Sequence, residues 1–585
     1  MSRKIKWKNA KMRRIVTKTT ALAVLLAAST TIHLPSVYAD DAPDQGLSNE
    51  PLTGDMFAIK PELWTSDARK SFHQWIRDTV PDTVPKDVQC KKVEKCDKHR
   101  VCVITCEPGS VVVDPWLQQA LKFERKLAYR RNFCHAHLPG THNSAITIAD
   151  GYGVEDHVFE GYLKYLSWFK KGMEVHTNDQ LFSLTDQLNM GVRFIELDVH
   201  WFNNDLHIAH CGGFHSALLD SLISAFNKIA NWLGTDIQWD SQTIGCKPSL
   251  SSIPASEQRR LDDALKEIST WLHKPENKDE FLMIFFDDEN NLFRWKKVTT
   301  MIKYLKSHFG PEEILLPADL VHTYGWPSFE TLLASGKRVI FMSGSNYSPR
   351  GDDVLFVKDE ICNWTEPQLP FEPYPSCNFP MEHMTPLDHR HWIFRPETSE
   401  IVYGFLNADG HLGDNTYILN ETSIPPMVEC GVNIPSPDNI TPKRVESTIW
   451  TLTRPDVLEP GKCVALIRSK LTWVSLDCEH PGIVAGCVQH GHHTRWALGP
   501  QPVKEKDAAA SCSSMSKFWV YDAPGNGLEN KFLHALLMQA PTSVQGVWLD
   551  AAALASEAFD NRVANMSPLS RVEQISDELA LNKAD

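Results

Sequence analysis

The sequence predicts an α/β protein built on a TIM-type (β/α)8 barrel, followed by a small cysteine-rich module. Between about residues 130 and 455, strand-like apolar runs alternate with helical patterns, as in a parallel sheet with crossover helices. Acidic and histidine residues recur where these runs end, which is where barrel enzymes carry their active sites. After residue 456 the pattern changes to short segments rich in Cys and Trp, which predicts the module.

The first 39 residues predict a secretory signal peptide. They begin with eight Lys and Arg and no acidic residue, continue with the apolar run ALAVLLAAS, and end in VYA before DDAPD. This apolar run is too short to cross a bilayer, and no later run reaches the roughly 18 apolar residues of a membrane span. We therefore expect a secreted, extracellular protein.

The charge of the chain restricts its partners. Removal of the signal peptide changes the formal net charge from −14 to −22, because eight positive charges are lost. Such an acidic chain is a poor ligand for nucleic acid, and we expect none. Peripheral contact with a membrane surface is expected, through bound calcium or through exposed aromatic side chains among the 18 Trp, and a soluble substrate is the alternative.

The fourteen cysteines all follow the predicted signal peptide, and an even count in an exported chain favours disulfides. Residues 40–125 form an N-terminal region with four of them, in CKKVEKCDKHRVCVITC, whose spacing fits no common zinc site. Four more cysteines lie in residues 457–585. Five Asn-x-Ser/Thr sequons are compatible with a glycoprotein, at Asn346, Asn363, Asn420, Asn439 and Asn565.

Residues 126–456 are assigned to the barrel, and the preceding stretch PWLQQALKFERKLAY is amphipathic. The strand candidates are RNFCHAHLPGTHN, VRFIELDVHW, LHIAH, EFLMIFFDDE, KRVIFMSG, EIVYGFL and STIWTLT. The helical patterns between them include LLDSLISAFNKIANWL, SEQRRLDDALKEISTWL and RWKKVTTMIKYLKSHF.

Residues 191–210, GVRFIELDVHWFNNDLHIAH, predict a functional strand. Alternate residues of a strand point to opposite faces, so Glu196, Asp198 and His200 share one face. Ionised groups are costly to bury without a partner, so this face must meet a metal, counter-charges or water. A strand with one solvated face is the simpler alternative.

Four segments carry a resemblance to a known family: LPGTHNSA (138–145), GVRFIELDVHW (191–201), LHIAH (206–210) and FLMIFFDDEN (281–290). They resemble the catalytic X region of phosphatidylinositol-specific phospholipases C, most closely the calcium-dependent eukaryotic site. The resemblance covers about residues 130–455 and also extends to secreted phospholipase C-like phosphodiesterases of microbial eukaryotes. It implies His142 and His210 as catalytic residues and Asn143, Glu196, Asp198 and Asp287 as metal ligands.

Two departures from this family bear on the site and the substrate. The family has Glu at the fourth ligand position, so Asp288 or Glu289 is an alternative ligand to Asp287. The chain also lacks a counterpart of the catalytic half that contacts the phosphoinositide head group in animal enzymes. The C-terminal module faintly resembles a C-type lectin, which implies carbohydrate binding.

The chemistry of these residues is coherent. Calcium takes six to eight oxygen ligands, and three carboxylates and one amide leave positions for substrate; magnesium is the alternative ion. We expect His210 to protonate the diacylglycerol oxygen, His142 to stabilise the transition state or act as base, and Glu196 to serve as base for the inositol hydroxyl. The expected products are diacylglycerol and a cyclic or open inositol phosphate.

Other readings stay open at this point. A sphingomyelinase D-like or glycerophosphodiester phosphodiesterase uses a similar barrel, and a non-catalytic carbohydrate- or surface-binding protein is the third class. His200 and Arg193 flank the site as phosphate contacts or supporting residues. Cys211 is expected in a structural disulfide with Cys246 or Cys134 rather than as a nucleophile.

Overall fold

The computed structural model describes residues 80–96, 102–153, 178–209, 256–288, 291–321, 325–362 and 418–559, with a few isolated residues between these ranges. All of them lie within the compact unit that spans Asp55–Asp585. The predicted signal peptide lies outside the described residues. Among the described helices, none combines the length and apolar character needed to cross a bilayer.

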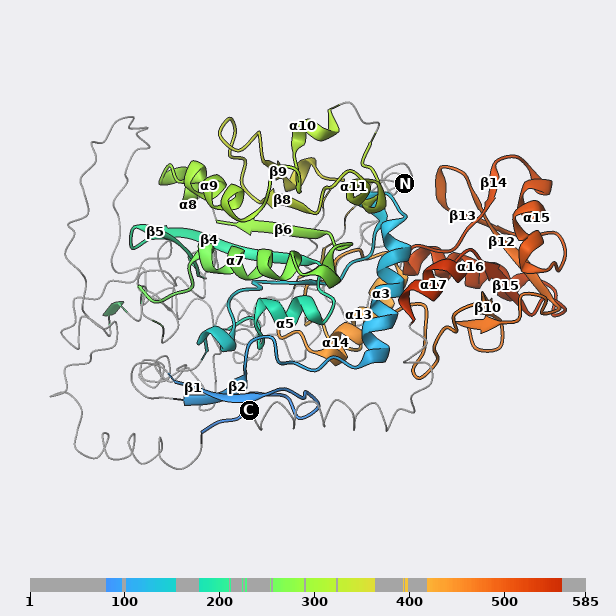
Figure 1. The fold of residues 1–585 in the computed structure, drawn as a ribbon, viewed down its shortest axis with the longest axis horizontal. Helices are drawn as coiled ribbons and strands as arrows, with labels where there is room; N and C mark the ends of the chain where they lie inside the picture. Colours follow the sequence, from blue (N-terminus) through green and yellow to red (C-terminus); the bar gives the residue numbers. More distant parts are fainter. Residues whose placement is uncertain are drawn as a thin grey trace, which may run out of the picture. The chain divides into compact units, whose positions relative to one another are not determined.

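A mainly parallel sheet organises the first part of the chain, with β4, β6 and β8 side by side (Figure 1). The strand order is β3-β4-β6-β8-β7, and β5 pairs with β4 and β9 with β8. All pairs are parallel except β4 with β5. The strand bounds are β3 Gly140–Thr141, β4 Phe194–Phe202, β5 Asp205–Ile208, β6 Leu282–Asp287, β7 Ile314–Leu315, β8 Val339–Ser343 and β9 Leu355–Val357.

Three predicted helices are confirmed: α3 (Pro115–Tyr129), α7 (Leu261–Leu272) and α9 (Val298–His308). In α7 the residues at helical spacing are buried, such as Leu261, Leu265 and Ile268, and they join the core beneath the sheet. Because helices such as α7 cover the sheet, the side chains of β6 and β8 are buried, and both strands have nearly continuous apolar sequences. Of the helix expected at 218–233, only residues 224, 227 and 228 are described, and these are helical. The strand EIVYGFL lies outside the described residues.

The strand predicted for LHIAH exists as β5, but the prediction that it is a parallel strand of a barrel is wrong. β5 runs antiparallel to β4, joined by a two-residue turn at Asn203 and Asn204. Both asparagines have positive φ, 50° and 61°, which is the backbone of a tight hairpin turn. Because β5 folds back, the chain after it returns beside β4, and the Ala209 N–H donates to the Asp198 carbonyl at 3.1 Å.

The strand predicted for STIWTLT is also wrong. A short helix, α14 (Pro442–Glu446), ends just before it. The backbone N–H groups of Trp450 and Thr451 donate to the buried carboxylate of Glu124 at 2.7 and 2.8 Å, rather than to a neighbouring strand. A side-chain acceptor from α3 thus replaces the sheet partner that the apolar pattern suggested.

Backbone hydrogen bonds extend the sheet beyond its named strands. Residues 433–436 lie along β3, since the N–H groups of Leu138 and Gly140 donate to the carbonyls of Asn433 and Pro435. Ser436 forms a parallel bridge with Glu397, and the Ile393 N–H donates to the Cys362 carbonyl beyond β9. These links run from one edge of the sheet toward the other. They agree with the predicted (β/α)8 barrel, which stays a prediction.

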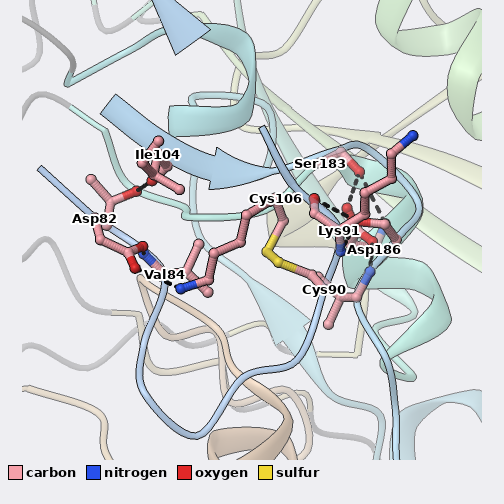
Figure 2. Close-up of a disulfide and its surroundings, with 12 residues drawn as sticks. Asp82, Val84, Cys90, Lys91, Ile104, Cys106, Ser183 and Asp186 are labelled. Atoms are coloured by element: carbon pink, nitrogen blue, oxygen red, sulfur yellow. Dashed lines mark hydrogen bonds and ion pairs between the residues drawn. A yellow bond between two sulfur atoms is a disulfide. The ribbon is translucent and has the colours of Figure 1, made fainter. Parts of the chain in front are cut away.

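Two disulfides close the N-terminal hairpin of β1 (Lys92–Cys96) and β2 (Cys102–Cys106): Cys90–Cys106 and Cys96–Cys102. Disulfides, not zinc, therefore account for this cluster. Figure 2 shows the hairpin beside Asp186 of α5 (Leu184–Asn189), whose carboxylate accepts from the N–H groups of Gly109 and Val111, both at 2.9 Å. This carboxylate ties the cysteine region to the parallel sheet.

The C-terminal part has a sheet of its own, ordered β11-β10-β15-β12-β13 with β14 paired to β12. The disulfides Cys463–Cys478 and Cys487–Cys512 cross-link it. The bounds are β10 Cys463–Ile467, β11 Thr472–Leu476, β12 Ile483–Gln489, β13 His492–Leu498, β14 Trp519–Tyr521, β15 Gly546–Leu549, α15 Ala508–Met515, α16 Gly527–Gln539 and α17 Ala552–Ala558. Disulfides throughout the described chain indicate an oxidising environment.

The helix α3 joins the two sheets, and the predicted boundary at residues 125 and 126 falls within it. Phe123 packs against Trp473 and Phe559, with ring centroids 5.8 and 6.0 Å apart, within one continuous core. The buried guanidinium of Arg131, just beyond α3, pairs with Asp522 at 2.9 Å and with Glu529 at 3.0 Å. The C-terminal part is therefore packed on α3 and not merely tethered to it.

A buried ion-pair cluster holds α3 to the sheet and gives a stability prediction. The Glu280 carboxylate lies 2.8 Å from both Arg125 and Arg193. Burial opposes its ionisation, but the two guanidinium groups prevail and lower the pKa of Glu280 to about 2. The ordinary pKa of a glutamate is 4.5, so the ionised Glu280 contributes its full stabilisation above that pH. The contribution is lost as the pH falls toward 2.

Glu280→Gln is expected to lower the free energy of unfolding by about 3 kcal/mol at neutral pH, because two buried arginines lose their counter-charge. Urea unfolding followed by fluorescence would measure it, and the loss should shrink at acidic pH. Glu429→Gln is the control, since this exposed carboxylate pairs with Lys531 at 3.4 Å and should matter by less than about 0.5 kcal/mol. Equal effects of the two changes would contradict the prediction.

Candidate functional site

The predicted acidic face of β4 meets an acidic residue of β6. In the parallel register Asp198 lies opposite Asp287, and Glu196 lies opposite Phe285, two residues earlier. Glu196 and Asp198 are buried, with 3% and 9% of their surface exposed. Parallel pairing therefore brings three predicted metal ligands to one face near the carboxyl ends of adjacent strands.

The turn after β3 places the fourth predicted ligand. Asn143 adopts a positive φ of 43°, which asparagine tolerates better than most residues. Its N–H donates to Glu196 Oε2 at 3.3 Å. Ser144 fastens the same turn to β4, because its N–H donates to the Glu196 carbonyl and its hydroxyl accepts from the Glu196 N–H, both at 2.9 Å. The segment THNS is thus locked against the acidic strand.

His142 is paired with a carboxylate that the sequence did not single out. Its Nδ1 lies 2.7 Å from Asp438 Oδ1, and both side chains are buried. Burial alone would lower the pKa of His142, but the charge and hydrogen bond of Asp438 prevail and raise this pKa well above its usual range. Asp438 therefore favours the protonated form of His142 and fixes its Nδ1.

Two features bring Asp438 to His142. The Gln180 amide donates to the His142 carbonyl at 2.7 Å and to the Pro437 carbonyl at 3.0 Å, clamping the two segments together. Gly140 allows close approach, since a Cβ there would lie only 2.6 Å from Ser436 Oγ. The glycine of the LPGTHN segment is therefore required by the close approach of Ser436, two residues before Asp438.

A buried arginine also enters the acidic face. The Arg395 guanidinium contacts the Glu196 carboxylate and lies 2.6 Å from the Glu397 carboxylate. It lies 4.8 and 5.4 Å from the ring centroids of Phe194 and Phe285, which are themselves stacked at 6.1 Å. Rings on both strands thus hold Arg395 in place, where it balances part of the charge on Glu196.

The carboxylates outnumber the cations at this site. Burial raises the pKa of Glu196 to about 7, although Arg395 opposes the rise. Burial, and then repulsion from Glu196 and Asp287, raises the pKa of Asp198 well above its usual range. Carboxylates that disfavour one another's ionisation are stabilised by a cation, so the face is suited to bind one.

The donor set fits a hard cation in its chemistry. Three carboxylates and the Asn143 amide supply oxygen ligands of the kind that calcium and magnesium prefer. Two tighter groups also occur, with ligand atoms within 4.8 Å of one another: His142 with Glu196 and Glu397, and His142 with Asp179 and Asp438. The oxygens of Glu196, Asp198 and Asp287 do not form such a group among the described residues.

Four residues that the sequence analysis placed in or beside the site are not seen to contribute to it. His210 and Glu289 lie outside the described residues. The alternative ligand Asp288 is buried, accepts from Ser345 Oγ and the Leu292 N–H, both at 2.8 Å, and so has a structural use. Arg193 belongs to the Glu280 ion pair and not to the acidic face.

The expected role of Cys211 as a disulfide-bonded residue is confirmed, but one suggested partner is wrong. Cys134 is bonded to Cys362, 228 residues later in the sequence, so it is not the partner of Cys211. Sequence spacing does not encode this link, because it depends on how the strands are ordered in space. His200 lies on the face of Glu196 and Asp198, paired in register with His207 of β5.

Sequence reasoning missed Asp438, Arg395 and Glu397. Each lies in a stretch of sequence, IFRPETSE or PSPDNITP, that lacks the alternating apolar pattern of a strand. The one available signal was their chemistry, a charged residue beside proline within the barrel region. That signal is common in loops, so it did not distinguish them.

Comparison with known proteins finds distant relatives whose names state no function. No family model matches the chain. Two proteins of Mycobacterium tuberculosis are similar to it: Uncharacterized protein MT2135 of strain CDC 1551 / Oshkosh and Uncharacterized protein Rv2075c of strain ATCC 25618 / H37Rv. Each is 22% identical over 464 residues, which cover 75% of this chain and 80% of the mycobacterial protein.

Proposed function

We propose that the protein is a secreted, metal-dependent phosphoric diester hydrolase that cleaves phosphatidylinositol or a related glycerophospholipid. The pairing of His142 with Asp438 beside the buried carboxylates of β4 and β6 is the observation that carries this proposal. A fixed imidazolium and a cation-binding acidic face are the two groups that a phosphodiester, with its negative charge, requires.

The roles follow from the charges of the residues. His142, held protonated by Asp438, binds a phosphate oxygen and stabilises the charge that builds up as the diester is attacked. Glu196, whose pKa is raised to about 7, accepts the proton of the attacking inositol hydroxyl. His210 gives a proton to the leaving diacylglycerol oxygen, as the resemblance implies. The products are diacylglycerol and a cyclic inositol phosphate, which water can open.

Asn143, Glu196, Asp198 and Asp287 are the residues proposed to hold the ion, and Glu397 lies beside Glu196 and His142. When bound, calcium or magnesium supplies positive charge that polarises the phosphodiester. Arg395 fixes Glu196, while Asn143 ties Glu196 to the turn that carries His142. The side chains are therefore positioned by this chain's own contacts.

The proposal predicts calcium-dependent release of water-soluble inositol phosphate from phosphatidylinositol vesicles by the purified chain. The assay compares calcium, magnesium and a chelator, with sphingomyelin and simple glycerophosphodiesters as alternative substrates. Release that a chelator abolishes would support the proposal. Cleavage of only the alternative substrates would contradict the phosphatidylinositol specificity, and no cleavage of any diester would favour a carbohydrate- or surface-binding protein.

A further inference from the structure

Two large aromatic side chains, Phe293 and Trp295, are exposed at a turn that follows β6. α8 (Asn291–Arg294) begins shortly after Asp287 and lies near the end of β4 (Figure 1). Phe293 is 55% exposed and Trp295 is 43% exposed. Exposed aromatic rings on a soluble surface often mark an interaction site.

Hydrogen bonds and one buried side chain fix the backbone of this turn. Leu292 is fully buried and fills the core position of the turn. The Asn291 N–H donates to the Asp288 carbonyl at 2.7 Å, and Asn291 Oδ1 accepts from the Trp201 N–H of β4 at 2.7 Å. The Lys297 N–H closes the turn on the Leu292 carbonyl at 2.8 Å. Phe293 and Trp295 therefore point outward from a fixed base.

Positive charge surrounds the two rings. Arg294 and Lys296 are exposed, and the Lys297 ammonium lies 3.7 Å from the ring centroid of Trp201. Three cations within four residues are a local reversal of sign in a chain of net charge −14. A partner for this turn must therefore accept aromatic rings and offer negative charge.

We propose that the segment Phe293–Lys297 docks the protein on an anionic phospholipid bilayer. Aromatic rings, and Trp above all, favour the boundary between head groups and acyl chains, and Lys and Arg are attracted to anionic head groups. A projecting turn of this size offers far less area than the roughly 800 Å² per partner of a stable protein interface. The bilayer is thus the partner that fits both its chemistry and its small extent.

Docking there would turn the carboxyl ends of β4 and β6 toward the lipid head groups. The turn follows Asp287 in sequence and is bonded to β4 just beyond His200. The inference rests on the proposed function for its substrate, but membrane binding itself does not require catalysis. The two can therefore fail separately.

Co-sedimentation with vesicles tests the docking surface. All chains carry His142→Ala, so that lipid is not consumed, and the vesicles are phosphatidylcholine with or without phosphatidylserine. Phe293→Ser with Trp295→Ser is expected to weaken binding at least about tenfold. Arg294→Gln with Lys296→Gln should remove the preference for phosphatidylserine. Phe518→Ser is the control, because Phe518 of the C-terminal part is also 55% exposed.

Three results would overturn the docking proposal: no vesicle binding by the parent chain, equal binding by the aromatic double variant, or equal loss with Phe518→Ser. A change in oligomeric size with the aromatic double variant would assign the turn to a second copy of the chain instead. If binding behaves as expected while chains with intact His142 cleave no diester, the docking surface stands and the proposed hydrolase fails.

Discussion

His142→Ala is expected to reduce turnover of phosphatidylinositol by at least about a thousandfold, the largest effect of any single change. The substitution removes the cation proposed to face the phosphate and takes away the His142 partner of the buried Asp438 carboxylate. Initial rates at saturating substrate would measure the loss in kcat. Folding is checked independently by the midpoint of urea unfolding.

Two further variants separate a catalytic role of His142 from a structural one. Asp438→Asn keeps the shape of the pair but removes the negative charge beside His142, so we expect a loss of about ten- to a hundredfold and a downward shift of the pH profile. His273→Gln is the matched control, since His273 also pairs with a carboxylate, Glu313 at 2.9 Å, but is 43% exposed and belongs to no part of the site. Full activity of His142→Ala, or equal losses with His273→Gln, would refute the assignment.

The second large effect is expected for Asp198→Asn, on the stability of the fold. The variant should be more stable than the parent chain without calcium and should lose most of the stabilisation that calcium gives. Without added metal this change should stabilise the fold, because it removes one charge from a group of mutually repelling buried carboxylates. With calcium, the parent chain should gain about 3 kcal/mol at a hundredfold excess over the dissociation constant, while the variant gains little. Thermal unfolding with calcium and with a chelator would show both effects.

Asp353→Asn is the control for this experiment, because Asp353 is 64% exposed and pairs with a surface lysine, Lys306. Its response to calcium should match that of the parent chain. If Asp198→Asn retains the full calcium shift, the ion binds elsewhere, and the groups of His142 with Glu397 or Asp179 become the next candidates.

The residues predictable from sequence are those on regular strands. Glu196, Asp198 and Asp287 could be foreseen because alternation along a strand and parallel pairing fix which side chains share a face. The amphipathic helices α3, α7 and α9 could be foreseen for the same reason, from a helical period of apolar residues. The closed barrel stays a prediction.

The residues that escaped prediction depend on contacts remote in sequence. Asp438 reaches His142 across 296 positions, through a clamp by Gln180 and a gap left by Gly140. Arg395 meets Glu196 across 199 positions. No local pattern marks such pairs. The direction of β5 was a different failure, because two consecutive asparagines before DLHIAH were a readable signal of a tight hairpin.

The helix α3 has a consequence for how this chain can evolve. Its face toward Trp473 and Phe559 is an internal surface of the protein, and Glu124 accepts three hydrogen bonds from Trp450 and Thr451. A gene rearrangement that cut the chain near residue 456 would leave this apolar face open to water. We therefore expect the two parts to be inherited as a pair.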